Sequence, residues 1–130
     1  RYYVSPGRDA VEQWRGDLTS VFAGLAEVAR RGIRFTESLL AHLGGKRNLG
    51  KARQLVEELR RIDDEMRIYG ELHPQCKPLV LISRYERENL EGADPIRLAE
   101  TTLRIYNDCH ARAMLTAAKI DEVAACCLNG

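Results

Sequence analysis

The sequence predicts an all-α fold, an antiparallel three-helix bundle. Three long stretches carry apolar residues at alternating spacings of three and four, and helix-ending and helix-starting residues separate one stretch from the next. On a helix of about 3.6 residues per turn, this spacing places the side chains in one stripe, which we call the seam. A seam is shielded from water only when it packs against other seams. The three helices are therefore expected to lie lengthwise against one another.

The first helix is expected over about residues 8–43. Ser5 and Pro6 favour a start here, since serine caps helices and proline is tolerated in the first turn. Gly44 and Gly45 favour an end, because glycine accepts the positive φ that often closes a helix. The seam of this helix comprises Val11, Trp14, Leu18, Val21, Leu25, Val28, Gly32, Phe35 and Leu39.

The second helix is expected over about residues 49–90, with Asn48 as its cap. Pro74 and Pro78 interrupt it, and a proline inside a helix costs roughly 3 kcal/mol, so the helix must be bent or broken near them. Because the spacing passes through both prolines in phase, we expect a bent but roughly coaxial arm. The alternative is two shorter helices and a four-helix bundle. The seam comprises Ala52, Leu55, Leu59, Ile62, Met66, Tyr69, His73, Cys76 and Val80, and more weakly Ser83, Arg87 and Leu90.

The third helix is expected over about residues 95–128. Asp94 and Pro95 form a strong start signal, a carboxylate cap followed by proline at the first helical position. The seam continues to the end of the chain as Ile96, Ala99, Leu103, Tyr106, His110, Ala113, Ala117, Ile120, Ala124 and Cys127.

Composition limits the functional classes. The 130 residues suit one domain, 1–130, and the formal net charge of +1 gives no global attraction to nucleic acid or to an anionic membrane. No apolar run approaches the ~20 residues of a membrane span. The chain begins with Arg1 rather than Met, and the four cysteines suit small buried side chains better than disulfides. We expect a fragment of a larger cytoplasmic protein, with cytoskeletal association as one location.

Catalytic and metal chemistry find little support. His73, Cys76, Cys109 and His110 are the residues that could hold zinc, but Pro74 separates the first pair and the second pair are adjacent, so they point in different directions. Glycine-rich phosphate loops and nucleophile motifs are missing from the sequence. We therefore expect a protein that is not an enzyme and needs neither metal nor cofactor.

Residues 54–117 resemble the second and third helices of a spectrin repeat. The stretch opens with a leucine and an acidic pair, has an aromatic residue near the middle of its first helix and a proline just after it, and starts its second helix with an isoleucine. Trp14 would match the tryptophan common in the first helix of such repeats, and Tyr106 lies near a frequent aromatic position. The segment from Trp14 to the second helix is longer than usual. Either the first helix is extended, or Phe35 is the equivalent residue and the residues before about Arg30 form an additional helix.

The resemblance implies a function as a non-catalytic structural and protein-interaction module. Spectrin repeats occur as spacers and docking domains in cytoskeletal crosslinkers and in Rho-family exchange factors of the Trio and Dbl kind. A self-contained adaptor bundle of the focal-adhesion-targeting or vinculin-like kind, which binds an amphipathic partner helix, is the alternative.

A second apolar stripe on the first helix supplies the predicted partner site. Core packing is the favoured explanation of such a broad stripe, since helices of globular bundles commonly need an apolar face of at least ~100°. If the stripe instead receives a partner helix or a neighbouring repeat, the contact residues are Phe22, Ile33, Leu40 and Leu43.

Basic residues near the first turn form a weaker candidate for contact with an acidic lipid or an acidic protein. Glu27 and Glu37 dilute their charge. The residues concerned are Arg30, Arg31, Arg34, Lys46 and Arg47.

Overall fold

The computed structural model describes residues 7–44, 48–88 and 94–129. Helices account for nearly all of these residues, and no strand occurs among them, so the all-α class is confirmed. The elements are α1 (Arg8–Gly44), α2 (Leu49–Leu72), the short 3-10 helix η1 (Pro74–Cys76), α3 (Lys77–Glu88) and α4 (Pro95–Asn129). The segment expected to form the second helix thus forms two α-helices, α2 and α3.

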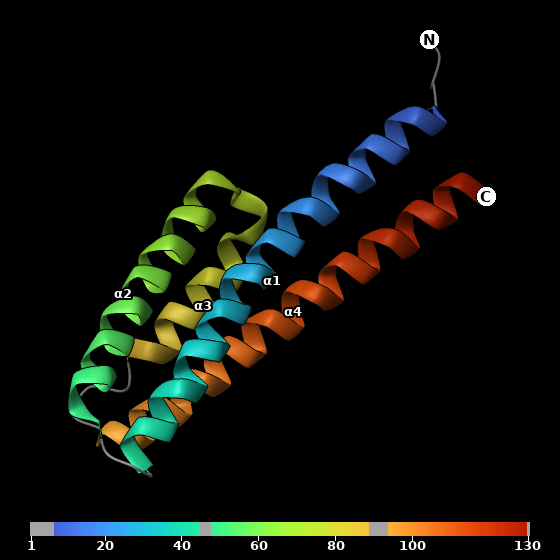
Figure 1. The fold of residues 1–130 in the computed structure, drawn as a ribbon. Helices are drawn as coiled ribbons and strands as arrows, with labels where there is room; N and C mark the ends of the chain where they lie inside the picture. The colour runs from blue at the N-terminus through green and yellow to red at the C-terminus, as the bar shows by residue number, and fades with distance from the viewer. Residues whose placement is uncertain (1–6, 45–47, 89–93, 130) are drawn as a thin grey trace.

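Two long helices, α1 and α4, form the framework against which the other helices pack. α1 and α4 run antiparallel over their whole length, and α2 and α3 lie against only the part of this pair that is far from the termini (Figure 1). We call this part, residues 21–44, 48–88 and 94–115, the head. We call the projecting helix pair, residues 8–20 of α1 and 116–129 of α4, the arm.

The chain reverses direction between α2 and α3. His73 leaves the helical conformation, with φ −127° and ψ 87°, so the break falls between Leu72 and Pro74. Both prolines then start helices, because Pro74 opens η1 and Pro78 lies in the first turn of α3, where the missing N–H costs no helical hydrogen bond. A methyl group on Gly70 of α2 would lie 3.1–3.3 Å from the Val80 side chain of α3. The two helices therefore pack side by side. The expectation that residues 49–90 form one bent but roughly coaxial helix is corrected.

Two of the predicted caps are confirmed. The Asn48 side chain accepts a hydrogen bond from the backbone N–H of Lys51 at 3.0 Å. Asp94 accepts from the backbone N–H groups of Ile96 and Arg97, both at 3.1 Å. Each cap supplies an acceptor to N–H groups that have no partner within the helix. The signals at Ser5, Pro6, Gly45 and Leu90 lie outside the described residues.

Tyrosine rings fill spaces beside helix glycines in the centre of the head. Tyr106 of α4 is fully buried, its ring lies against Gly32 of α1, and its hydroxyl donates a hydrogen bond to Asp63 of α2. One side chain thus joins three helices. Tyr69 of α2 packs in the same way beside Gly24 and donates to the backbone carbonyl of Val21 at 2.6 Å.

The four cysteines differ in accessibility. Cys76 and Cys109 are buried, and Cys126 and Cys127 are exposed. Burial in apolar surroundings, with a smaller effect from nearby Cys109, raises the pKa of the Cys76 thiol to about 11. Since the thiolate is the reactive form, Cys76 is chemically inert in the folded protein near neutral pH.

This difference predicts the thiol chemistry. At pH 8 an aromatic disulfide reagent should modify Cys126 and Cys127 rapidly, and Cys76 and Cys109 only after unfolding in denaturant. Because the folded-state pKa of Cys76 is raised above its ordinary value near 9, its contribution to stability is complete below about pH 9 and is lost as the pH rises toward 11. The melting temperature should fall across that interval. Rapid reaction of Cys76 in the folded protein at pH 8 would contradict the burial.

Candidate functional site

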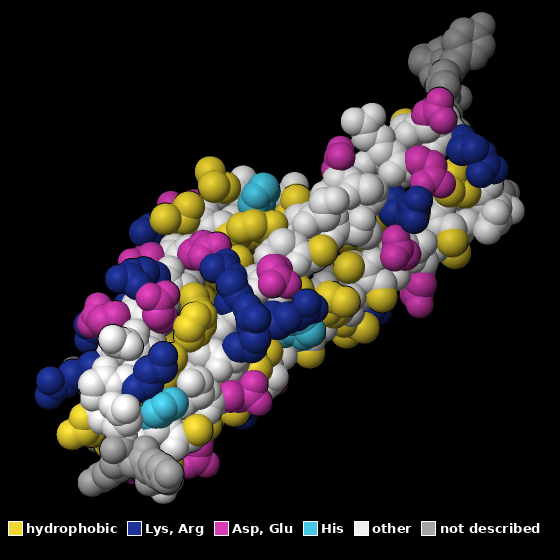
Figure 2. Space-filling model, in the orientation of Figure 1, with side chains coloured by type: hydrophobic (Ala, Val, Ile, Leu, Met, Phe, Trp, Pro, Cys, Tyr) yellow, Lys and Arg dark blue, Asp and Glu magenta, His cyan; other side chains and the backbone are white. Residues whose placement is uncertain are grey.

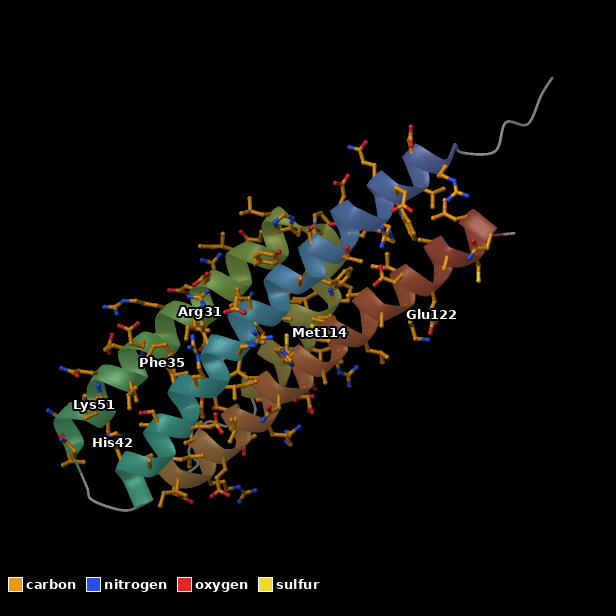
Figure 3. The ribbon with its side chains drawn as sticks, turned by 45° about the vertical axis from the view of Figure 1, so that its right-hand side comes forward. Arg31, Phe35, His42, Lys51, Met114 and Glu122 are labelled. Carbon is orange, nitrogen blue, oxygen red and sulfur yellow. The ribbon has the colours of Figure 1, made fainter. Side chains whose placement is uncertain are left out.

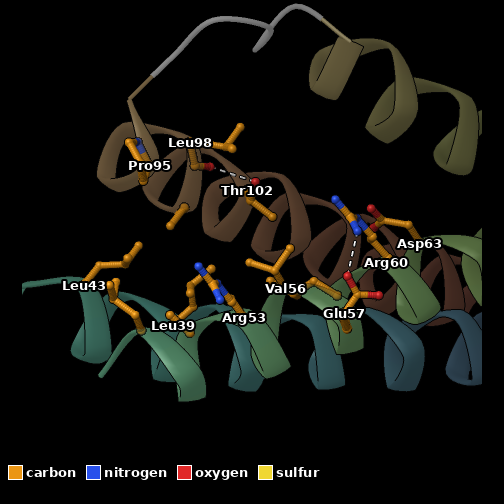
Figure 4. A pocket seen from close by; sticks show the side chains of 14 residues that line it. Leu39, Leu43, Arg53, Val56, Glu57, Arg60, Asp63, Pro95, Leu98 and Thr102 are labelled. Atoms are coloured by element: carbon orange, nitrogen blue, oxygen red, sulfur yellow. Dashed lines mark hydrogen bonds and ion pairs between the residues drawn. The ribbon is translucent and has the colours of Figure 1, made fainter. Parts of the chain in front are cut away.

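An apolar groove lies at the end of the head that is far from the arm. Its volume is about 510 Å³, and it is enclosed by the last turns of α1, the first half of α2 and the start of α4 (Figure 4). Pockets of roughly 300–1,000 Å³ with mostly apolar walls are typical binding sites. The apolar walls of this groove are Leu39 and Leu43 of α1, Leu49, Ala52, Val56 and Leu59 of α2, and Pro95, Leu98 and Ala99 of α4.

The groove follows from the unequal lengths of two helices. α2 has 24 residues and α3 has 12, which correspond to about 36 Å and 18 Å of helix at 1.5 Å per residue. α3 therefore accompanies α2 over about half its length. None of the described residues of α3 lines the groove. At this end, α1, α2 and α4 enclose the position beside them that α3 fills in the rest of the head.

Charged side chains border the apolar walls. Arg60 forms an ion pair with Glu57 at 2.6 Å, and Asp63 receives the hydrogen bond of the Tyr106 hydroxyl. Arg53 is exposed at the rim, and no ion pair to it occurs among the described residues (Figure 4). The rim therefore offers a guanidinium that can bind an anionic group.

The predicted partner residues on α1 have different environments. Phe22 is buried in the core, and Ile33 and Leu40 are partly buried and pack against it. Leu43 also packs against the core but lines the groove as well. Most of the second stripe thus serves packing, and the structure brings one of its predicted site residues to the groove.

The walls that α2 and α4 contribute were not predicted from the sequence. Val56 and Leu98 line the groove although each is the neighbour of a seam residue rather than part of a seam. Both are large apolar residues with substantial exposure, 36% and 40%. Apolar residues beside the seam, at matching ends of two helices, were the available signal.

The basic residues near the first turn are partly neutralised. Arg30 pairs with Glu27 at 3.2 Å, and Arg31 pairs with Glu65 across the interface of α1 and α2, where Figure 3 shows it. The hydrogen bond that Arg31 donates to the Glu65 carboxylate raises the pKa of Arg31. Arg34 is exposed, and Lys46 and Arg47 lie outside the described residues. Basic and acidic side chains alternate over the face drawn in Figure 2. Contact with an acidic lipid stays a prediction.

The histidines and cysteines considered for zinc are not assembled into a site. Within the described parts of the chain, no three histidine, cysteine or acidic side chains lie close enough together to hold a metal ion. His73 packs against Tyr69 with ring centroids 4.5 Å apart and the ring planes tilted by 45°. His110 has a buried Nε2 atom for which the described residues supply no hydrogen-bond partner.

Comparison of the chain with protein-family models, with curated proteins and with solved structures gives no match. The resemblance to spectrin repeats therefore stays a prediction from the sequence. None of the helices in the described parts of the chain is long and apolar enough to cross a membrane.

Proposed function

We propose that the chain is a non-catalytic docking module whose groove receives one amphipathic helix of a protein partner. The groove itself is the observation that supports this proposal: α1, α2 and α4 line an apolar groove that none of the described residues of α3 fills. A partner helix would complete a four-helix cross-section there, and this arrangement favours the adaptor alternative over the spectrin-like three-helix bundle. The same mode, an apolar helix face in a hydrophobic groove, recurs among peptide-binding proteins.

The length and charge of the groove define the partner helix. The α2 wall extends from Leu49 to Asp63, about 21 Å of helix, which is enough for apolar anchors at i, i+4 and i+7. An acidic residue beside those anchors would meet Arg53 at the rim. We therefore expect a helix of about three turns with an apolar stripe and acidic flanks.

A pair of designed peptides tests the docking. Both carry leucine at i, i+4 and i+7 and a fluorescent label, and they differ in having either glutamate or lysine beside the leucines. The glutamate peptide should bind more tightly, with the difference reduced in Arg53→Ala. The double variant Val56→Glu and Leu98→Glu should weaken its binding more than tenfold, because it places carboxylates on the groove walls.

The matched control for this double variant is Ile68→Glu. Ile68 lies on α2 with 45% exposure and does not line the groove. All three positions are exposed enough that thermal melting should change little. The docking proposal is wrong if Ile68→Glu weakens peptide binding as much as the double variant does. It is also wrong if neither peptide binds the parent protein.

The arm favours a second function. Two antiparallel helices leave the head together, and a spacer between modules of a cytoskeletal or Rho-signalling scaffold would use such a pair to hold its neighbours at a distance (Figure 1). Two copies joined through a continuous α4–α1 helix should then scatter X-rays as one extended rod. A flexible joint between the two heads would argue against the spacer.

A further inference from the structure

Part of the apolar face of the head continues onto the arm. Five turns of about 3.6 residues make eighteen residues, so residues eighteen apart on one helix point in the same direction. On α4, Val123 of the arm shares its direction with Ile105 of the head, and Cys127 with Cys109. Ile105 and Cys109 are 1% and 2% exposed, whereas Val123 is 51% exposed and Cys127 is exposed. The α4 face that is covered in the head is therefore uncovered on the arm.

α1 shows the same relation. Trp14 of the arm shares its direction with Gly32, and Ala10 with Val28. Gly32 and Val28 are buried in the head, whereas Trp14 is 42% exposed and Ala10 is exposed. In the head, Tyr106 of α4 covers Gly32, and the α2–α3 hairpin packs on α1 as far as Val21, whose carbonyl accepts the hydrogen bond of the Tyr69 hydroxyl. Beyond Val21 the hairpin ends, and the apolar face continues as Trp14 and Ala10 beside exposed Asp17, which shares its direction with Phe35.

Polar contacts hold the two helices of the arm together independently of the hairpin. Arg15 of α1 lies 3.7 Å from Asp121 of α4, and Arg8 donates a hydrogen bond to the backbone carbonyl of Leu128 at 3.4 Å. Ile120 and Ala124 of α4 are buried within the arm. The uncovered face is thus presented by a paired, two-helix surface rather than by separate helices.

We propose that this face binds the same face of a second copy of the chain, with the two arms antiparallel. The face is two helices wide, and in the head it takes two helices, α2 and α3, to cover it. The arm of a second copy supplies two helices of the same length and has its own face covered at the same time. The end of the hairpin blocks an incoming head, so the two heads lie at opposite ends, with Trp14 close to Trp14 of the other copy.

The size of the face sets the strength of the dimer. Thirteen residues of α1 give about 20 Å of length, and two helices about 10 Å wide give roughly 400 Å² per copy. Stable interfaces bury about 800 Å² per partner. The dimer should therefore be reversible and form with rising protein concentration, at micromolar levels or above.

Trp14 is the only tryptophan, so its fluorescence reports on the arm alone. Sedimentation equilibrium should show the mass rising from one chain to two between about 1 µM and 1 mM, and the Trp14 emission should move to shorter wavelength with the same midpoint. Val123→Glu should weaken the dimer at least tenfold. Leu115→Glu is the matched control, because Leu115 is 59% exposed on the same helix but shares its direction with exposed Arg97.

Three results would overturn the proposal. The first is a single-chain mass throughout the concentration range. The second is a dimer that leaves the Trp14 emission unchanged, which would place the interface elsewhere. The third is an equal loss in Val123→Glu and Leu115→Glu. Circular dichroism melting of both variants shows that a lost dimer is not lost folding, since both side chains are exposed in the single chain.

Discussion

Replacing Gly32 with alanine should destabilise the protein by about 2 kcal/mol, although alanine is the better helix former. The added methyl group would lie 2.7–2.8 Å from three ring carbons of Tyr106. The ring cannot withdraw easily, because it is fully buried and its hydroxyl is bound to Asp63 on a third helix. Overpacking of this kind costs typically 1–3 kcal/mol or more, which exceeds the gain in helix propensity of about 1 kcal/mol. Urea unfolding at constant m-value measures the difference.

Gly16→Ala on the same helix is the matched control. Apart from its own turn of helix, no atom of the described residues lies within 4 Å of a methyl group at Gly16, and the position is exposed on the arm. The same substitution should therefore stabilise the protein here by about 0.5–1 kcal/mol. Replacing the ring with a smaller side chain, in the double variant Gly32→Ala and Tyr106→Leu, should recover part of the lost stability. The two side chains compete for one space. Equal effects of Gly16→Ala and Gly32→Ala would contradict the packing of Tyr106 against Gly32.

Local physical chemistry made the helices predictable. The expected starts at Arg8, Leu49 and Pro95 match the structure, since each depends on residues next to it in the chain. Asn48 and Asp94 act on N–H groups no more than three residues away, so their role can be inferred without knowing the fold.

The reversal at His73 could not be predicted from the seam. We expected a coaxial second helix because the apolar spacing continues in phase from Tyr69 through Cys76 to Val80. Phase shows which side of a helix faces the core, and it is silent on the direction in which the chain runs. α3 returns beside α2 with Cys76 and Val80 still buried, so both arrangements satisfy the same pattern.

The groove depends on the same reversal. Its position follows from α3 being half as long as α2, and that length is defined only once the chain breaks at His73. Leu43 was predicted because it lies on a long apolar stripe. Val56 and Leu98 lie far apart in sequence and line the same groove only because α2 and α4 both pack against α1.

Replacing Gly70 with leucine tests the α2–α3 hairpin and should destabilise the protein by about 1–3 kcal/mol. Gly70 is buried, and its space is limited by the branched end of Val80, which lies 3.1–3.3 Å from the position of a methyl group there. A leucine side chain extends further and must push α3 away from α2. The loss should appear as a lower urea midpoint, and Val80→Ala in the same chain should restore part of it because it vacates that space.

Glu71→Leu is the control, since Glu71 is the next residue on α2 and is exposed. It pairs with Arg67 at the surface, and loss of such an exposed pair costs little, so its stability should stay within about 0.5 kcal/mol of the parent. If α2 and α3 formed one coaxial helix, Gly70 and Val80 would be about 15 Å apart along its axis. Gly70→Leu would then gain helix propensity without a clash and would be neutral or stabilising, and Val80→Ala would have no effect on it. The sign of the change in stability caused by Gly70→Leu therefore distinguishes the hairpin from a coaxial helix.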